Sequence, residues 1–100
     1  MLKTTPSIYY FHAPWCAPCK TLGPIVERVV DATGGEVGLV KIDIEQNPGI
    51  ANKYHVSSVP VLMAVLDGRL QEEKCGSMAE AQVRALVNRL LNLSRGLIPS

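Results

Sequence analysis

Two cysteines stand three positions apart in this chain, at Cys16 and Cys19, with Ala17 and Pro18 between them. A CxxC pair can cycle between a dithiol and a disulfide, because its sulfurs can bridge and proline restricts the intervening loop. The thiolate is the attacking species, so Cys16 would form a mixed disulfide with an oxidised partner and Cys19 would then displace it. The spacing therefore predicts thiol-disulfide exchange, with Cys16 as nucleophile and Cys19 as resolving cysteine.

The elements around the pair decide whether its first sulfur is activated. Ser7–His12 is a short, uncharged, β-prone run, typical of a buried strand. Beyond the pair, apolar residues recur every three or four positions, as on an amphipathic helix that ends near Gly34-Gly35; they are Leu22, Ile25, Val26, Val29 and Val30. Cys16 is thus expected at the helix cap and Cys19 in its first turn, where unpaired N–H groups and the helix dipole favour a thiolate.

The rest of the chain supplies further strands and helices around this unit. Pro24 should kink the first helix without ending it, and Val37–Ile44 is predicted as a second strand. Asn47 as side-chain cap and Pro48 at the first helical position predict a short helix running to about Tyr54.

The last third of the chain is predicted as a hairpin followed by a helix. Val59–Leu66 and Leu70–Cys75 are joined by Asp67-Gly68, a strong two-residue turn signal. Ser77 and Glu80 have the spacing of a capping box for a final helix, whose core-facing stripe is Val83, Leu86, Val87, Leu90 and Leu91. The element order β-α-β-α-β-β-α predicts an α/β fold with a mixed sheet flanked by helices.

Several of these segments together resemble the thioredoxin family. The run Trp15–Lys20 (WCAPCK) is similar to the family's WCGPCK signature, Asp43–Tyr54 (DIEQNPGIANKY) resembles its DxDxNPxxAxxY stretch, and Val59-Pro60-Val61 falls where it carries a cis-proline. The similarity is continuous from Ser7 to about Asn92. It implies a thioredoxin-like fold with a four-stranded mixed sheet, lacking the first strand and helix of full-length thioredoxins, and the activity of a protein-disulfide oxidoreductase.

The resemblance also implies how partners are received. Pro60 would be cis and lie beside the nucleophile, and Trp15, Val59, Pro60 and Gly76 would form an apolar platform that binds disulfide-containing protein substrates. The only redox group would be the Cys16–Cys19 disulfide, with no other cofactor and no metal. An external donor similar to thioredoxin reductase would reduce it.

One departure from the family affects the proton chemistry. Thioredoxins carry a buried aspartate six residues before the nucleophile, and Tyr10 occupies that position here, which leaves the family's partner lysine, Lys41, without its acid. Tyrosine is a poor base at neutral pH, so we expect slower resolution by Cys19 and a weaker enzyme. His12 lies on the same strand face, where it stabilises the thiolate, shuttles a proton or merely packs at the strand end, while Lys20 lends positive potential.

Alternatives to this interpretation remain at the level of sequence. Cys16, Cys19, Cys75 and His12 could form a zinc set, although a second close cysteine pair is missing. Cys75 is expected to be a small core residue, or else a thiol near the platform that can be oxidised. The alternative function is a redox-capable module that binds a partner and catalyses weakly.

Composition sets the limits of these predictions. The chain has 100 residues, 47% of them hydrophobic, and a formal net charge of +1, which fits one domain (1–100) and indicates neither nucleic acid nor membrane as a partner. The core should span about 7–92, with a loose tail at 93–100. Three cysteines and an N-terminus without a secretory pattern predict a cytoplasmic protein. The strand edge Val37–Asp43, guarded by Lys41, Asp43 and Glu45, should be open and permit weak dimerisation.

Overall fold

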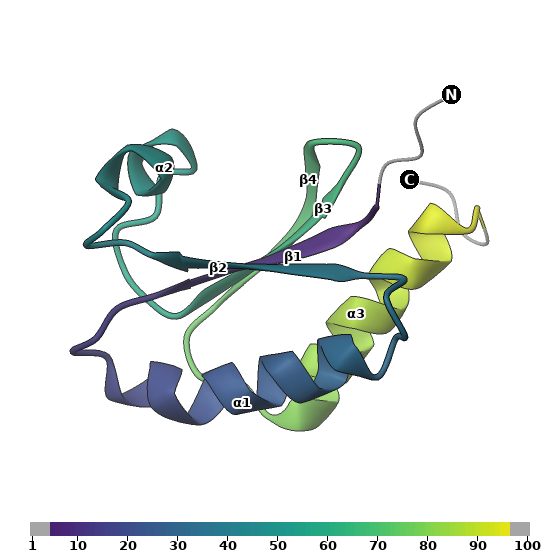
Figure 1. The fold of residues 1–100 in the computed structure, drawn as a ribbon, viewed down its shortest axis with the longest axis horizontal. Coiled ribbons are helices and arrows are strands. Elements are labelled where there is room, and N and C mark those ends of the chain that lie inside the picture. The colour runs from purple at the N-terminus through teal and green to yellow at the C-terminus, as the bar shows by residue number, and fades with distance from the viewer. Residues whose placement is uncertain (1–4, 97–100) are drawn as a thin grey trace.

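The structure of the chain is a computed structural model that describes residues 5–96. In chain order its elements are β1 (Ser7–His12), α1 (Ala17–Asp31), β2 (Gly38–Asp43), α2 (Pro48–Lys53), β3 (Val61–Leu66), β4 (Arg69–Cys75) and α3 (Glu80–Ser94). The strands form a central sheet, with α1 and α3 on one side and α2 on the other (Figure 1). The predicted element order and thioredoxin-like α/β fold are confirmed.

The four strands form one mixed sheet in the order β2-β1-β3-β4. The central strand β1 is parallel to β2, with His12 opposite Asp43, and antiparallel to β3, with Phe11 opposite Val61. Because parallel strands end at the same edge of a sheet, the loops that follow β1 and β2 emerge side by side. This arrangement places the CxxC loop next to the segment that leads into α2.

The hairpin between β3 and β4 forms as the sequence predicts. Asp67 and Gly68 both have positive φ, 54° and 74°, which is the backbone of a two-residue turn that follows the twist of the strands. The ladder shifts register between Ala64 and Val65, so the alternation of side chains along the hairpin is interrupted there.

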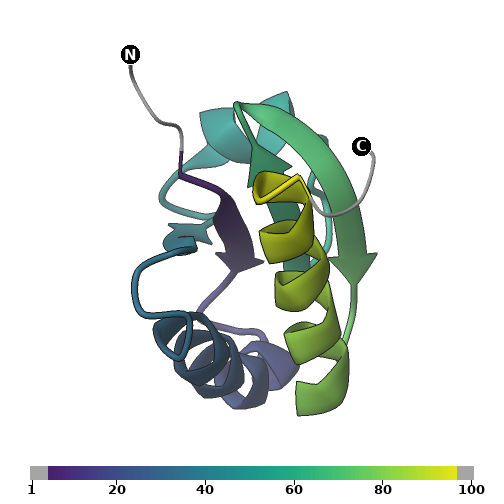
Figure 2. The same ribbon diagram turned by 90° about the vertical axis from the view of Figure 1, so that its right-hand side faces the viewer.

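Apolar side chains pack on both faces of the sheet. The larger cluster lies between the sheet and helices α1 and α3, which are neighbours in Figure 2, α1 seen nearly end-on and α3 upright. It includes Ile8, Leu22, Val26, Leu62, Leu86 and Leu90. The smaller cluster lies toward α2 and includes Phe11, Ile42, Ala51, Met63 and Val65. The strand β1 contributes to both, as expected for a strand in the middle of a covered sheet.

The helix ends differ from the prediction in detail. The helix α3 begins at Glu80 with Ala79 as its cap, and the Gln82 side chain accepts a hydrogen bond from the Ala79 N–H at 2.8 Å, so the predicted Ser77–Glu80 capping box is wrong. Ser77 stands two residues before the observed cap, Ala79. Asn47 occupies the N-cap position of α2, but its side chain donates to the Asp43 carbonyl at 3.1 Å and accepts no N–H of the helix, so the predicted side-chain cap is wrong.

The C-terminal boundary also needs a correction. The predicted loose tail at 93–100 is helical at its start, because α3 continues to Ser94 and the Arg95 N–H still donates to the Leu91 carbonyl. Residues 97–100 of that predicted tail lie outside the described residues.

The prediction that Cys75 is a core residue is wrong. Cys75 is a free thiol and is exposed at the end of β4. The strand β4 is an edge strand, and most of its residues are polar, which agrees with the exposure of Cys75.

Within residues 5–96, none of the helices is both long enough and apolar enough to cross a membrane.

Candidate active site

The cysteine pair lies at the start of α1, and its two residues are joined by a disulfide with Cα atoms 5.3 Å apart. Cys16 is the N-cap, and its sulfur accepts a hydrogen bond from the Cys19 N–H at 3.2 Å, which confirms the predicted cap position. Pro18 stands in the first turn, where its missing N–H costs nothing. Cys16 is 4% and Cys19 6% exposed, so both residues of the pair are largely buried.

The residue before the pair is held by an acid from the neighbouring loop. Trp15 is 62% exposed, and its indole N–H donates to a carboxylate oxygen of Glu45 at 2.7 Å. Glu45 follows β2 directly, so this bond joins the two loops that leave the parallel strands. The large exposed ring is therefore fixed beside the disulfide.

The residues expected to receive a partner come from the segments around β3 and β4. The Val59–Pro60 peptide bond is cis, as the family resemblance implies. The Gly76 N–H donates to the Pro60 carbonyl at 2.9 Å, and Gly76 has a φ of 86°, a conformation that favours glycine. Val59 is half-buried and Pro60 is buried.

A shallow apolar hollow of about 330 Å³ adjoins the first turn of α1. It lies between that turn and the segment after β4, and it is lined by Ala17, Pro18, Thr21, Leu22, Ser77 and Met78. Among the residues that the structure describes, no charged one lines this hollow.

Tyr10 is buried behind the resolving cysteine. Its hydroxyl donates to the backbone carbonyl of Cys19 at 2.8 Å. Burial, and then the charge of Glu27, raise the pKa of Tyr10 above its ordinary value of 10.0. The phenol therefore keeps its proton and supports the helix backbone, and it cannot act as a base near neutral pH.

Lys41 is paired, which corrects the expectation that it has lost its acid. Its ammonium group forms an ion pair with the carboxylate of Glu27, which reaches it from α1. In the family the acid partner of this lysine stands on β1. Here α1 supplies a different acid, Glu27.

A cleft of about 310 Å³ opens beside Cys19. It brings together four of the predicted site residues, Tyr10, His12, Lys20 and Lys41, and adds Glu27. The His12 ring stacks on Tyr10 with centroids 5.1 Å apart and an interplanar angle of 25°, so the two share one face of β1 as predicted.

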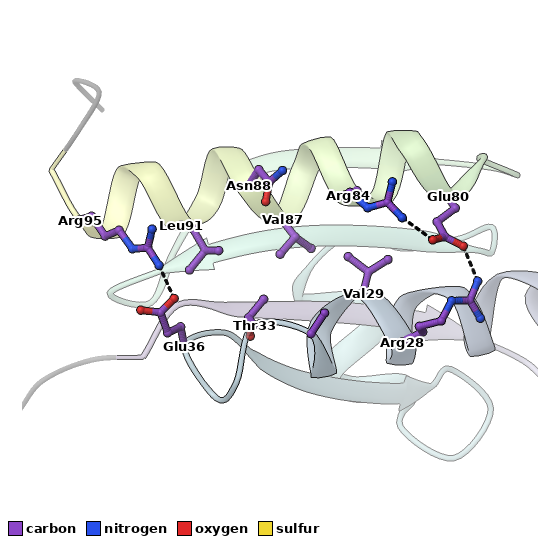
Figure 3. A pocket seen from close by; sticks show the side chains of 11 residues that line it. Arg28, Val29, Thr33, Glu36, Glu80, Arg84, Val87, Asn88, Leu91 and Arg95 are labelled. Carbon is purple, nitrogen blue, oxygen red and sulfur yellow. Dashed lines mark hydrogen bonds and ion pairs between the residues drawn. The ribbon is translucent and has the colours of Figure 1, made fainter.

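A larger hollow of about 500 Å³ lies elsewhere, between α1 and α3 (Figure 3). Val29, Val87 and Leu91 point into it. An ion pair of Arg28 with Glu80 joins α1 to α3 across it, and one of Arg95 with Glu36 joins the end of α3 to the segment between α1 and β2. None of the predicted site residues lines it. Within the described part of the chain, no three His, Cys, Asp or Glu side chains gather as a group that could hold a metal ion.

Two residues of this site were not assigned a role from the sequence. Glu45 was considered only as an edge charge, although its place directly after β2 puts it beside the loop after β1. Glu27 stands eight residues after Cys19, with Gly23 midway, and this spacing of four places all three on one face of α1. Both signals were present in the sequence.

Comparisons with known proteins agree with this geometry. The family model described as Thioredoxin matches residues 1–89. The mitochondrial thioredoxin of Bos taurus is 39% identical over 87% of this chain, and the match covers 52% of that protein. The thioredoxin of Bacillus subtilis is 38% identical over 81% of this chain and 78% of its own length. The chain thus spans about half the length of the mitochondrial relatives that it matches.

Solved structures show the same fold. A mutant thioredoxin from Halobacterium salinarum superposes with a TM-score of 0.76 at 32% identity, covering 94% of this chain and 78% of that chain. A thioredoxin-2 of a malaria parasite gives a TM-score of 0.81, covering 89% of this chain and 86% of that chain, and at 24% identity it speaks for the fold alone.

Proposed function

The chain belongs to the thioredoxin family, and we propose that it is a thiol-disulfide oxidoreductase that reduces disulfides in other proteins. One observation carries this proposal: the Cys16–Cys19 disulfide lies at the N-terminus of α1, with the Cys16 sulfur accepting a backbone N–H. That hydrogen bond and the helix dipole stabilise a thiolate at Cys16 once the pair is reduced.

Cys16 is the nucleophile and Cys19 the resolving residue. The Cys16 thiolate attacks a disulfide of the partner, which leaves one partner sulfur as a thiolate and the other in a mixed disulfide. Cys19 then attacks the Cys16 sulfur, the mixed disulfide breaks, and the internal disulfide forms again. Pro18 keeps the turn between the sulfurs fixed, and the exposed Lys20 adds positive potential at the site.

The substrate-binding platform consists of Trp15, Val59, Pro60 and Gly76. Trp15 offers a large exposed ring held by Glu45, and Pro60 lacks an N–H, so a partner strand can approach its backbone without meeting a competing donor. The apolar hollow beside Pro18 extends the same surface. We assign disulfide-containing proteins in extended conformation as substrates.

The enzyme needs no redox group besides its own disulfide, and an electron donor similar to thioredoxin reductase regenerates the dithiol. Such a cycle fits a cytoplasmic protein, where dithiol donors hold thiols reduced. Cell fractionation with detection of the untagged chain tests this location, and recovery in an oxidising compartment would contradict it.

Tyr10 makes the enzyme slower than a thioredoxin with a buried acid. Its hydroxyl already donates to the Cys19 carbonyl and its pKa is raised by burial and by Glu27, so it provides no base for the resolving thiol. We expect turnover below that of the Bacillus subtilis relative, measured side by side.

The edge strand β2 is the proposed site of weak dimerisation. Within residues 5–96, β2 pairs only with β1, and Val40 is exposed on it beside the charged Lys41. Sedimentation over a range of concentrations, with Val40→Lys as a variant that repels a second edge, tests this. A chain that remains monomeric at high concentration would exclude self-pairing.

The activity is tested by following reduction of a protein disulfide such as that of insulin in the presence of a dithiol. Cys16→Ser should lose the activity, while the matched Cys75→Ser should keep it. If Cys16→Ser binds partners as well as the parent and neither protein reduces disulfides, the alternative function, a partner-binding module, is correct.

A further inference from the structure

The cleft beside Cys19 is the part of this site for which the reaction above gives no role. Before Cys19 can attack the mixed disulfide, its thiol must give up a proton, because the thiolate is the nucleophile. Cys19 is buried, and it lines this cleft, which is wide enough to admit water. A proton acceptor for Cys19 is therefore to be sought among the side chains that line this cleft.

The lining groups differ in what they can accept. Tyr10 is excluded as the acceptor, because its raised pKa keeps the hydroxyl protonated and this proton is donated to the Cys19 carbonyl. Lys20 and Lys41 are ammonium groups and carry no free electron pair when protonated. Glu27 is bound in an ion pair with Lys41. His12 remains, and imidazole is the side chain whose ordinary pKa lies closest to neutral pH, which makes it the best matched acceptor.

The position of His12 supports this choice. Its ring stacks on Tyr10, and the Tyr10 hydroxyl is bonded to the Cys19 backbone, so one ring separates the imidazole from the resolving residue. His12 is half-buried and lines the same cleft as Cys19, so water in the cleft can bridge the two side chains.

Charged groups of both signs lie around His12. On the helix side these are Lys20 and Glu27, and on β2 they are Lys41 and Asp43, the latter directly opposite His12 in the register. These two cations and two carboxylates balance in formal charge.

We propose that His12 accepts the proton of Cys19 through the cleft, and that the Glu27–Lys41 ion pair sets the charge around it. This rests on the proposed function. The Cys19 S–H proton passes to a free ring nitrogen of His12, the Cys19 thiolate attacks the Cys16 sulfur, and the bond between Cys16 and the partner sulfur breaks. The partner leaves as a thiolate. In the reverse direction the imidazolium returns its proton to Cys19.

The test isolates the resolving step. In a Cys75→Ser background, the reduced protein is treated at acidic pH with the symmetric disulfide of a nitrobenzenethiol. Cys16 attacks this disulfide, one nitrobenzenethiolate leaves, and the other stays bonded to Cys16 while the acidic pH keeps Cys19 protonated. A stopped-flow jump to higher pH then starts attack by Cys19, and the coloured thiolate is released. The rate is measured as a function of the final pH.

We expect the rate to rise through the range in which imidazoles titrate, about pH 6 to 7. His12→Asn should slow release at neutral pH at least about tenfold and remove this rise, leaving only the rise due to thiol ionisation. Formation of the mixed disulfide, measured in the same samples, should change less than about twofold, which shows that the fold and Cys16 are intact. His55→Asn, the other histidine, is the matched control and should behave as the parent.

Two further variants separate the roles in the cleft. His12→Phe keeps a ring to stack on Tyr10 and should be as slow as His12→Asn. Glu27→Gln should move the pH midpoint to lower values by a fraction of a unit without lowering the plateau, because a carboxylate favours the imidazolium. An unchanged profile in His12→Asn, or loss of the rise in Glu27→Gln alone, would overturn the assignment. If the parent protein forms the mixed disulfide and never releases the thiolate, the proposed function itself fails.

Discussion

Cys16 and Cys75 are both cysteines at the end of a secondary-structure element, yet their surroundings are opposite. Cys16 caps a long helix that packs on the core, is buried, and accepts a backbone N–H at its sulfur. Cys75 ends an edge strand of mostly polar residues, is exposed, and donates its S–H to the carboxylate of Glu73. The comparison predicts that exposure does not decide the reactivity of the two thiols, because a backbone N–H donates to the Cys16 sulfur whereas a carboxylate lies beside the Cys75 sulfur.

The largest difference expected between the two regions is in packing. Leu22, one turn after the cysteine pair, is 2% exposed in the core, whereas Leu70 on β4 is 48% exposed. Leu22→Ala should lower the free energy of unfolding by about 3 kcal/mol, because it leaves a cavity. Leu70→Ala should cost less than about 0.5 kcal/mol. Urea unfolding of the oxidised proteins measures both, and equal losses would show that the two ends are packed alike.

The next difference is in thiol reactivity. Partial burial of the sulfur, and then the hydrogen bond and charge of Glu73, raise the pKa of Cys75 above its ordinary value of 9.0. The helix terminus lowers the pKa of a cysteine at its cap. In the reduced protein at pH 7, iodoacetamide should therefore modify Cys16 at least about tenfold faster than Cys75, followed by peptide mass spectrometry.

This ratio should fall as the pH rises, because Cys75 becomes ionised only under alkaline conditions. Glu73→Gln removes the anion beside Cys75. It should therefore raise the modification rate of Cys75 and leave the rate of Cys16 unchanged. A Cys75 that reacts as fast as Cys16 at pH 7 would contradict the contrast between the two sites.

The same two regions show what could be predicted from the sequence. The Cys16 environment depends on local spacing, a strand, a CxxC turn and an amphipathic helix, so the fold order and the cap position followed from short-range patterns. The prediction of a buried Cys75 followed from its small apolar side chain. Its polar neighbours Glu72, Glu73 and Lys74 are the better signal, because they indicate an exposed strand.

Contacts between elements were the other part that could not be predicted. The Tyr10 hydroxyl bond to Cys19 and the Glu27–Lys41 ion pair depend on side-chain rotamers and on how α1 crosses the sheet, and neither is set by sequence spacing alone. Ala79, the N-cap of α3, has no side-chain acceptor, so no sequence pattern marks it as a cap. Its N–H donates to the side chain of Gln82, which lies inside the helix.

A substitution at Tyr10 tests whether a hydrogen bond also stabilises the buried region around Cys16. Tyr10→Phe removes the hydrogen bond to the Cys19 carbonyl and should cost about 1 kcal/mol of unfolding free energy at pH 7. The bond ends on the backbone, so the loss should be the same in the oxidised and reduced proteins. A loss seen in only one redox state would show that Tyr10 responds to the disulfide itself.

The pH dependence of this effect has a defined sign. The folded-state pKa of Tyr10 is raised above 10.0, by burial first and by Glu27 second, so its contribution is fully present below pH 10 and is lost as the pH rises through the folded-state value. The stability difference between the parent and Tyr10→Phe should therefore shrink above about pH 10. A difference that stays constant there would contradict the assignment.

The smallest effect is expected where β4 is tied to α3 on the exposed side. Arg89 donates from Nε to Glu72 at 2.9 Å and pairs with its second oxygen, and the hydrogen bond and charge of Arg89 lower the pKa of Glu72 below its ordinary value of 4.5. The lowered pKa contributes stability above pH 4.5 that is lost as the pH falls through the folded-state value. Because the pair is partly solvated, Arg89→Ala should cost about 0.5 kcal/mol at pH 7 and almost nothing below about pH 3.

Arg69, at the other end of β4, is the matched control, since it forms no ion pair within residues 5–96 and its replacement by alanine should cost less at either pH. Thermal unfolding at both pH values measures the two variants together. An Arg89→Ala loss that persists at acidic pH would mean that the arginine acts through the packing of its stem on β4, because protonation of Glu72 removes the charge but leaves that contact. Apolar contact would then stabilise the region around Cys75, as it stabilises the region around Cys16. The two regions would differ only in the reactivity of their cysteine sulfurs.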